Sequence, residues 1–201
     1  DGRVRGHADV SGDGQQRLVA DVAGVDLGAA LPLRKATGLD LLGKVTGTAD
    51  LTLPAEGVQR ASGRVDLQLA EAGVAGGQLP VPGMSGGLPL PKIGLGQVTA
   101  AVKVGDGRAT FEKLEAKGGD AELQTDGLSF VVQQRMEFAP LNGLAKLKVR
   151  DAFWSRGGTQ SFKTLADVAL ASARGADGAW SFTVSGSVGH PRMQPMAGAA
   201  R

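Results

Sequence analysis

The chain has 201 residues, a length that fits one domain, and its 22 Lys and Arg nearly balance its 20 Asp and Glu. The charges are spread without runs, so they form no basic stripe of the kind that binds nucleic acid. The chain has no Cys, which excludes disulfides, thiol nucleophiles and thiolate metal sites. This absence agrees with either a reducing cytosol or a disulfide-free periplasm.

The composition differs between the two halves of the chain. Aromatic residues make up only 4% of the sequence, and all of them lie after residue 110. The first half must therefore bury Val, Leu and Ala alone. Because aromatic side chains carry large buried areas, we expect the first half to be thinner and less stable.

The start of the chain bears on its origin. It begins with Asp1 and not with Met, and no apolar stretch approaches the roughly 18 residues that a membrane helix needs. We therefore expect a fragment or a processed chain, and removal of an N-terminal anchor is one way in which such a chain arises.

Alternation of apolar and polar residues predicts the first strands. It is weak over the first 25 residues, clean at 44–53 and clean again at 64–69, with a turn at 54–57 between the last two. One short helical turn, ended by Pro32, is expected at 26–31.

A proline- and glycine-rich tract at 78–96 separates the two halves. Proline cannot donate a hydrogen bond to a sheet ladder, so we predict a loop with extended flanks. A loop of this length is usually functional or disordered, and we expect it to contact a partner, with a simple spacer as the alternative. The residues expected to make that contact are Pro80, Pro82, Met84, Leu88, Pro89, Leu90, Pro91 and Ile93.

Beyond residue 96 the alternation predicts a meander of strands. Glycine-containing turns are expected at 105–107, 118–120 and 126–127. The phase of the alternation slips at 113–114, which predicts a β-bulge.

The last third of the chain holds further strands and the best helix candidate. Strands are expected around 147–149 and 180–188, and a helix at 161–174 that begins at a Ser or Thr cap. We expect Phe162 and Leu165 of this helix to plug an open end or edge of the sheet.

The number of strands predicts the architecture. About ten strands each have one apolar face, which a sheet must bury, yet at most two short helices can cover them. We therefore predict one mainly β domain over 1–201, built as a strongly curved antiparallel sheet with one or two short helices. A half-barrel or trough is the expected shape, and a closed barrel or a sandwich is the alternative.

Two motifs that suggest chemistry have simpler readings. The stretch 83–87 matches the G-x-S-x-G elbow around Ser85, but prolines flank it and no helix follows. The stretch 38–44 resembles a phosphate-binding loop, but Val45 stands where Ser or Thr must bind magnesium. A flexible loop and a strand start are the preferred interpretations, and an esterase built on Ser85 is kept only as an alternative to test.

Histidines and carboxylates give no clearer site. His7 and His190 are the only histidines and lie nearly a whole chain apart, so surface positions are expected. Four carboxylates lie close together but alternate with lysines, as cross-strand charge pairs do; they are Glu112, Glu115, Asp120 and Glu122. We therefore predict no enzyme activity, no catalytic residue, no metal and no cofactor.

Short phrases in the chain carry a family resemblance. They are LPLPKIGLG at 88–96, Val98, Val102, GRA at 107–109, KGGD at 117–120, LKVRDAF at 147–153 and GAWSFTVSGS at 178–187. With these phrases the sequence resembles the type II secretion system protein N family, over about residues 38 to 195. The chain also looks related to AsmA-like proteins, whose curved sheets form lipid-holding troughs.

The resemblance implies a location and a role. The family is a periplasmic β-structure, normally tethered to the inner membrane by a helix that this sequence does not contain, and it accompanies a machine that exports folded proteins. No catalytic residues come with it. We expect an accessory component that contacts other secretion proteins through sheet edges and the 78–96 loop. The alternative is an AsmA-like lipid-binding trough lined by the aromatic-free half.

Overall fold

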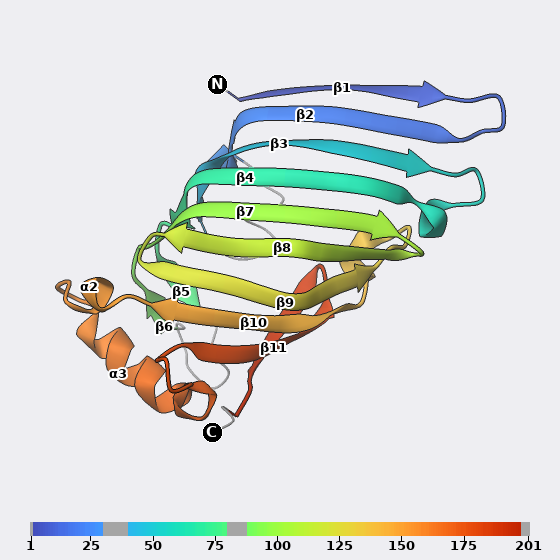
Figure 1. The fold of residues 1–201 in the computed structure, drawn as a ribbon. Helices are drawn as coiled ribbons and strands as arrows, with labels where there is room; N and C mark the ends of the chain where they lie inside the picture. The colour runs from blue at the N-terminus through green and yellow to red at the C-terminus, as the bar shows by residue number, and fades with distance from the viewer. Residues whose placement is uncertain (1, 30–39, 80–87, 198–201) are drawn as a thin grey trace.

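A computed structural model describes residues 2–29, 40–79 and 88–197. The main element of the fold is a ten-stranded antiparallel sheet (Figure 1). Its strands, in spatial order, are β1 (Arg3–Val10), β2 (Gln16–Asp26), β3 (Leu41–Leu53), β4 (Ser62–Val74), β7 (Ile93–Gly105), β8 (Arg108–Gly118), β9 (Ala121–Val131), β10 (Leu141–Val149), β11 (Trp180–Ser187) and β12 (His190–Pro195).

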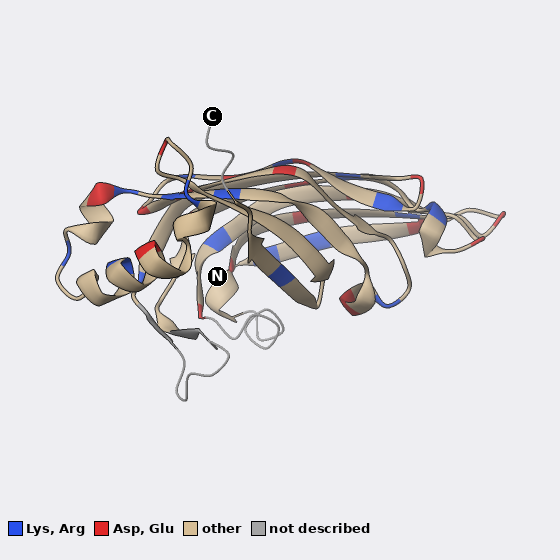
Figure 2. Ribbon diagram, turned by 90° about the horizontal axis from the view of Figure 1, so that it is seen from below, with Lys and Arg blue, Asp and Glu red and all other residues tan. Residues whose placement is uncertain are grey.

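The sheet is an open meander. Its strands pair in chain order, with β5 and β6 skipped between β4 and β7, and no pairing among the described residues joins β1 to β12. The sheet is arched (Figure 2). The predicted curved antiparallel sheet is therefore confirmed as an open trough, and the alternative of a closed barrel is wrong.

The tract predicted as a loop at 78–96 contains strands at both ends. Two short strands, β5 (Gly77–Leu79) and β6 (Leu88–Leu90), pair with each other as a separate ribbon, and β7 of the main sheet already begins at Ile93. A proline such as Pro89 is tolerated in a two-stranded ribbon, because its missing N–H can face the unpaired side. Of the other predicted contact residues, Leu88 and Leu90 lie in β6 and Pro91 lies between β6 and β7. Pro80, Pro82 and Met84 lie outside the described residues.

Two of the three turns predicted in the meander are confirmed. β7 and β8 are joined at Asp106 and Gly107, whose φ angles of 52° and 72° are those of a tight hairpin turn. β8 and β9 are joined around Gly118 and Gly119.

The third predicted turn is wrong, because β9 runs through residues 126–127. Gly127 has a φ of 59°, and the register with β10 shifts between Asn142 and Leu144. Gly127 and Leu128 form a bulge opposite Gly143 here, and the chain does not turn. The bulge predicted at 113–114 lies at Glu112, since Ala101 pairs with Lys113 while Val102 pairs with Phe111.

Helices are few in the described part of the chain. The α-helices are α2 (Asp151–Trp154) and α3 (Gln160–Ala169), and the short 3-10 turns are η1 (Leu27–Ala29), η2 (Val58–Arg60), η3 (Met136–Phe138) and η4 (Ala171–Ala173). The helix predicted at 161–174 corresponds to α3 with η4, and the turn predicted at 26–31 to η1. Thr159 stands at the start of α3, but its hydroxyl donates to the carbonyl oxygens of Trp154 and Arg156 instead of capping the helix.

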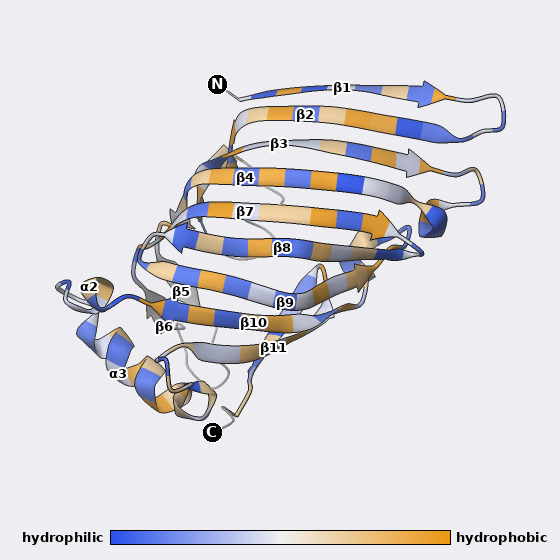
Figure 3. Ribbon diagram, in the orientation of Figure 1, coloured by the Kyte–Doolittle hydropathy of each residue, from blue (hydrophilic) through white to orange (hydrophobic). Residues whose placement is uncertain are grey.

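The two faces of the sheet differ in polarity, as the alternating colours along the strands show (Figure 3). One unbroken row of directly paired apolar residues crosses eight strands: Val25, Val45, Leu69, Val98, Ala116, Leu123, Leu147 and Trp180. The opposite face carries ion pairs such as Arg17 with Asp50 and Arg64 with Glu112. This segregation follows from the period-two pattern of the sequence.

Helix α3 covers the apolar face at one end of the sheet, beside β10 and β11 (Figure 1). Here Trp154 stacks on Phe162 with ring centroids 5.9 Å apart and meets Trp180 edge-on at 6.3 Å. The predicted plugging role of Phe162 is confirmed, and Leu165 is half-buried. The buried residues of this aromatic cluster are Phe153, Trp154, Ala166, Ala173, Trp180 and Phe182.

Candidate functional site

An apolar trough is the best candidate for a binding site. It lies on the inner face of the sheet, which is the face that carries the apolar row, and it spans β3, β4, β7, β8 and β9. Its cavity holds about 480 Å³, within the range of small-molecule sites. All but two of its lining residues are apolar, and none is ionisable: Leu51, Leu53, Val58, Ala61, Val65, Leu67, Ala100, Val102, Val104, Ala109, Phe111, Phe130, Val132, Gln133, Gln134 and Met136.

Small side chains on the floor of the trough explain why it is hollow. Ala100 pairs directly with Leu67, and Ala109 lies between Val104 and Phe130. The two alanines are buried, while the larger neighbours are only half-buried. A methyl group fills little of the space between two large side chains, so the alternation of sizes leaves a groove where uniform leucines would close it.

One end of the trough is closed by segments outside the strands. Val58 and Ala61 of the β3–β4 connection pack with Val132, which follows β9 and whose N–H donates to the carbonyl of Gly107 at 2.9 Å. Met136 of η3 lines the same end and stays partly exposed. These residues have no periodic pattern, and sequence reasoning missed their role.

The two sides of the trough are unlike each other. Toward β9, Phe111 and Phe130 form a wall, with their rings in edge-to-face contact at 6.2 Å. Toward β1, the apolar face continues through Leu18 and Ala8, and among the described residues no helix packs on it. The trough therefore opens toward the N-terminal edge of the sheet.

Charged residues lie on the opposite face and neutralise one another. Arg17 binds the carboxylate of Asp50 at 2.7 Å, and Arg64 bridges Asp66 and Glu112. Hydrogen bonds from Lys113 and then Lys117 hold the pKa of Glu115 below its ordinary value. All four carboxylates predicted to form charge pairs are ion-paired, but the cross-strand pattern is confirmed only in part, because Glu115 pairs with lysines of its own strand.

The most enclosed ion pair joins the turn after β8 to the loop after α2. Both oxygens of the Asp120 carboxylate are bound by Arg156, and one of them also accepts the Gly94 N–H at 2.9 Å. Partial burial favours the neutral acid, but the hydrogen bonds from Arg156 and Gly94 outweigh it and lower the pKa of Asp120. This carboxylate, with its side chain only 15% exposed, ties three segments together.

The two histidines lie on opposite edges of the sheet. His7 is in β1, exposed and 3.6 Å from Asp9, and His190 is the exposed first residue of β12. Within residues 2–29, 40–79 and 88–197, no three His, Asp or Glu come together in a group able to hold a metal ion.

The remaining candidates give no converging geometry. Gly43 and Lys44 lie inside β3, so the helix that a phosphate-binding loop requires does not follow them. Ser85 lies outside the described residues. Ile93, expected to contact a partner, is half-buried and packs against the aromatic cluster, and its predicted partner contact stays a prediction.

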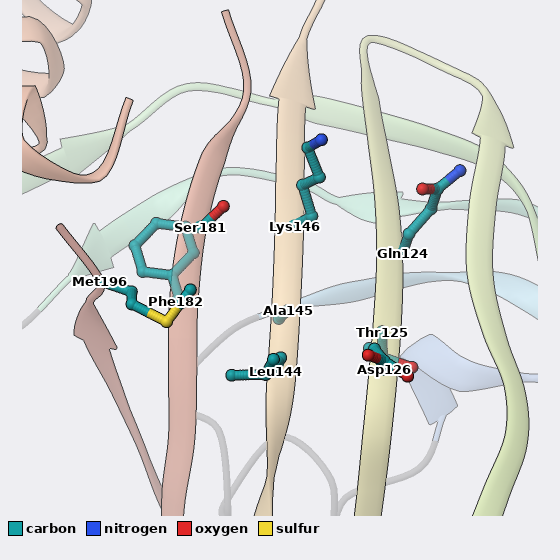
Figure 4. Close-up of a pocket in the computed structure, with 9 residues that line it drawn as sticks. All are labelled: Gln124, Thr125, Asp126, Leu144, Ala145, Lys146, Ser181, Phe182 and Met196. Atoms are coloured by element: carbon teal, nitrogen blue, oxygen red, sulfur yellow. The ribbon is translucent and has the colours of Figure 1, made fainter. Parts of the chain in front are cut away.

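A second, smaller hollow lies between β9, β10, β11 and the segment after β12 (Figure 4). It holds about 230 Å³. Its charged side chains, Lys146 and Asp126, lie at opposite ends of the group in Figure 4, and the Lys146 amine is bound to Asp177 at 2.6 Å. The hollow therefore brings no reactive pair together.

Comparison of the chain with protein-family models, curated proteins and solved structures finds no match. In the part of the chain that the structure describes, no helix has the length and apolar character needed to cross a membrane.

Proposed function

We propose that the protein is a non-catalytic binding component of the bacterial periplasm, an accessory part of a type II secretion system. The observation that carries the proposal is the open sheet itself, which presents an apolar trough and two edges that pair with no further strand of the described residues. Apolar surface and unpaired strand edges are the means by which β-proteins hold other chains. The assignment to a type II secretion system is supported by the resemblance of the phrases at 88–96 and 178–187 to the protein N family.

A complementation assay tests this role. In a bacterium that secretes by this route, deletion of the gene should lower the amount of exported protein in the medium, and the wild-type gene should restore it. A variant with Val65→Ser and Leu67→Ser, both in the trough, should restore less than a matched Asp66→Ser variant on the opposite face of the same strand. Normal export by the deletion strain would remove the proposal.

A lipid-binding trough is the second candidate, and the lining of the cavity favours it. None of the described residues that line the groove is ionisable, and its volume of about 480 Å³ can take part of an acyl chain. In this role the trough shields hydrocarbon from water, and the polar end of the lipid stays outside.

Mass spectrometry of organic extracts from the purified protein separates the two roles. The lipid role predicts co-purifying phospholipid, and its loss when Ala100→Phe fills the floor of the trough. Thr99→Phe, on the opposite face of β7, is the matched control and should keep the lipid. Extracts without lipid from wild-type protein would leave the interaction role alone.

A further inference from the structure

The two edges of the sheet are built differently. The edge strand β12 contains Pro191 and Pro195, which cannot donate ladder hydrogen bonds, so a partner strand cannot pair along it without interruption. The edge strand β1 has eight residues, no proline, and every residue exposed. No other strand of the described residues pairs with its outer side. Unprotected edges of this kind are docking sites for another strand.

The side chains of β1 divide into an apolar and a charged row. Val4 and Ala8 pair with Val22 and Leu18 of β2, which places them on the apolar face of the sheet, and Val10 follows in the same row. Val4 and Val10 are 64% and 70% exposed, unusual for large apolar residues on an inner face. The other row holds Arg3, Arg5, His7 and Asp9.

We propose that a second copy of this chain pairs with β1 in antiparallel register, about a twofold axis at His7. In this register Arg5 faces Asp9 of the second copy, and by symmetry Asp9 faces Arg5. On the inner face Val4 lies opposite Val10 of the second copy, again twice. An isologous contact needs such self-complementarity, because each residue must suit the one it meets.

Neighbouring registers satisfy fewer of these pairs. If the axis lies between two residues, for example between Gly6 and His7, apolar side chains come opposite charged ones. Such a pairing is unfavourable, since directly opposed residues must point to the same face. An axis at Gly6 leaves Val10 opposite Gly2. An axis at Ala8 leaves Val4 opposite Gly12. The axis at His7 is the one that joins both large apolar residues and both opposite charges.

The dimer would extend the trough. A twofold axis perpendicular to the sheet keeps both apolar faces on the same side, so the two inner faces become continuous across the β1 strands. The N-terminal side, toward which the trough opens and which neither α-helix of the described residues covers, then becomes the centre of a wider groove. This inference does not depend on which of the two functional roles holds.

A cysteine at the axis tests the proposal directly. Directly opposed residues of antiparallel strands have Cα atoms about 4.5–5.5 Å apart, which suits a disulfide, and the chain has no Cys of its own. Purified His7→Cys should therefore form a covalent dimer on mild oxidation. His190→Cys, at the proline-containing edge, should stay monomeric under the same conditions.

Charge reversal tests the register. By analytical ultracentrifugation the wild type should be a dimer, and Arg5→Asp and Asp9→Arg should each be monomeric, because like charges then meet twice. An equimolar mixture of the two variants should dimerise again, since both charged pairs across the axis are then of opposite sign. Arg192→Asp on β12 should stay dimeric. A monomeric wild type, dimers unaffected by either reversal, or a mixture that stays monomeric would each overturn the proposal.

Discussion

The N-terminal strands β1–β4 and the C-terminal strands β8–β11 share one pairing pattern but not one kind of core. Among the described residues before residue 100, only Ala61 and Ala72 are buried apolar residues, whereas Phe153, Trp180 and Phe182 lie in the aromatic cluster at the other end. The expectation of a thinner first half is thus borne out in its packing. Alternation suffices to form a strand, but only large side chains and a covering helix close a core.

Amide hydrogen exchange should show the largest difference between the two regions. Amides of β9, flanked by paired strands and packed side chains, should open only with the whole fold, while those of β1 should open locally. The free energies of opening then span from near zero to the full stability, typically about 5–15 kcal/mol. Equal protection of β1 and β9 would show that the sheet unfolds as one unit. Exchange should be measured at a protein concentration low enough for the proposed dimer to dissociate, because pairing through β1 would itself protect the amides of β1.

Truncation of the most buried aromatic side chain should destabilise the closed half of the sheet, which is the C-terminal strands β8–β11 with the aromatic cluster. Phe153 is 0% exposed, so Phe153→Ala should destabilise the protein by about 3–5 kcal/mol. Leu18→Ala in β2 removes a half-buried side chain and should cost about 1 kcal/mol. Urea unfolding measures how much unfolding free energy each variant loses. Similar losses for the two variants would contradict the proposed difference between the halves.

A charge on the inner side of α3 should separate the helix from the sheet. Phe162→Asp loses the stacking on Trp154 and drives a carboxylate toward an apolar cluster, so about 2–3 kcal/mol should be lost. Leu165→Asp should act in the same direction. Val168 is 74% exposed, and Val168→Asp should melt within error of the wild type.

Removal of the Asp120 charge should destabilise the fold by less than Phe153→Ala. Asp120→Asn weakens the bonds from Arg156 and Gly94, at a cost of roughly 1.5–3 kcal/mol. Because its folded pKa is lowered, the carboxylate stabilises the fold above its unfolded pKa of about 3.9 and loses this effect as the pH falls through the folded value. The difference between wild type and variant should therefore shrink in acid.

Glu122→Gln is the matched control for Asp120→Asn. Glu122 also binds an arginine, Arg150, but in an exposed position where solvent screens the pair. Its removal should change the melting temperature little at any pH. A difference between wild type and Asp120→Asn that persists unchanged down to a pH of about 2, below the usual range for a carboxyl group, would show that the charge is not the cause.

The strands and their faces could be predicted from the sequence because period two is a local signal. Most of the row from Val45 to Trp180 follows from the alternation alone, but Ala116 does not, because it comes after the bulge at which the phase slips. The bulge at Gly127 was not, because a glycine with positive φ serves a turn and a bulge equally, and only the partner strand decides between them. The closure of the trough also escaped, because Val58 and Met136 come from short segments without periodicity.

The aromatic cluster decides what spectroscopy can observe. Both tryptophans, Trp154 and Trp180, lie in this one cluster at the C-terminal end. Intrinsic tryptophan fluorescence therefore reports on the closed half of the sheet and is blind to β1–β4. If the open half melts first, circular dichroism will register a transition that the fluorescence emission does not, and the gap between the two curves measures how loosely the halves are coupled.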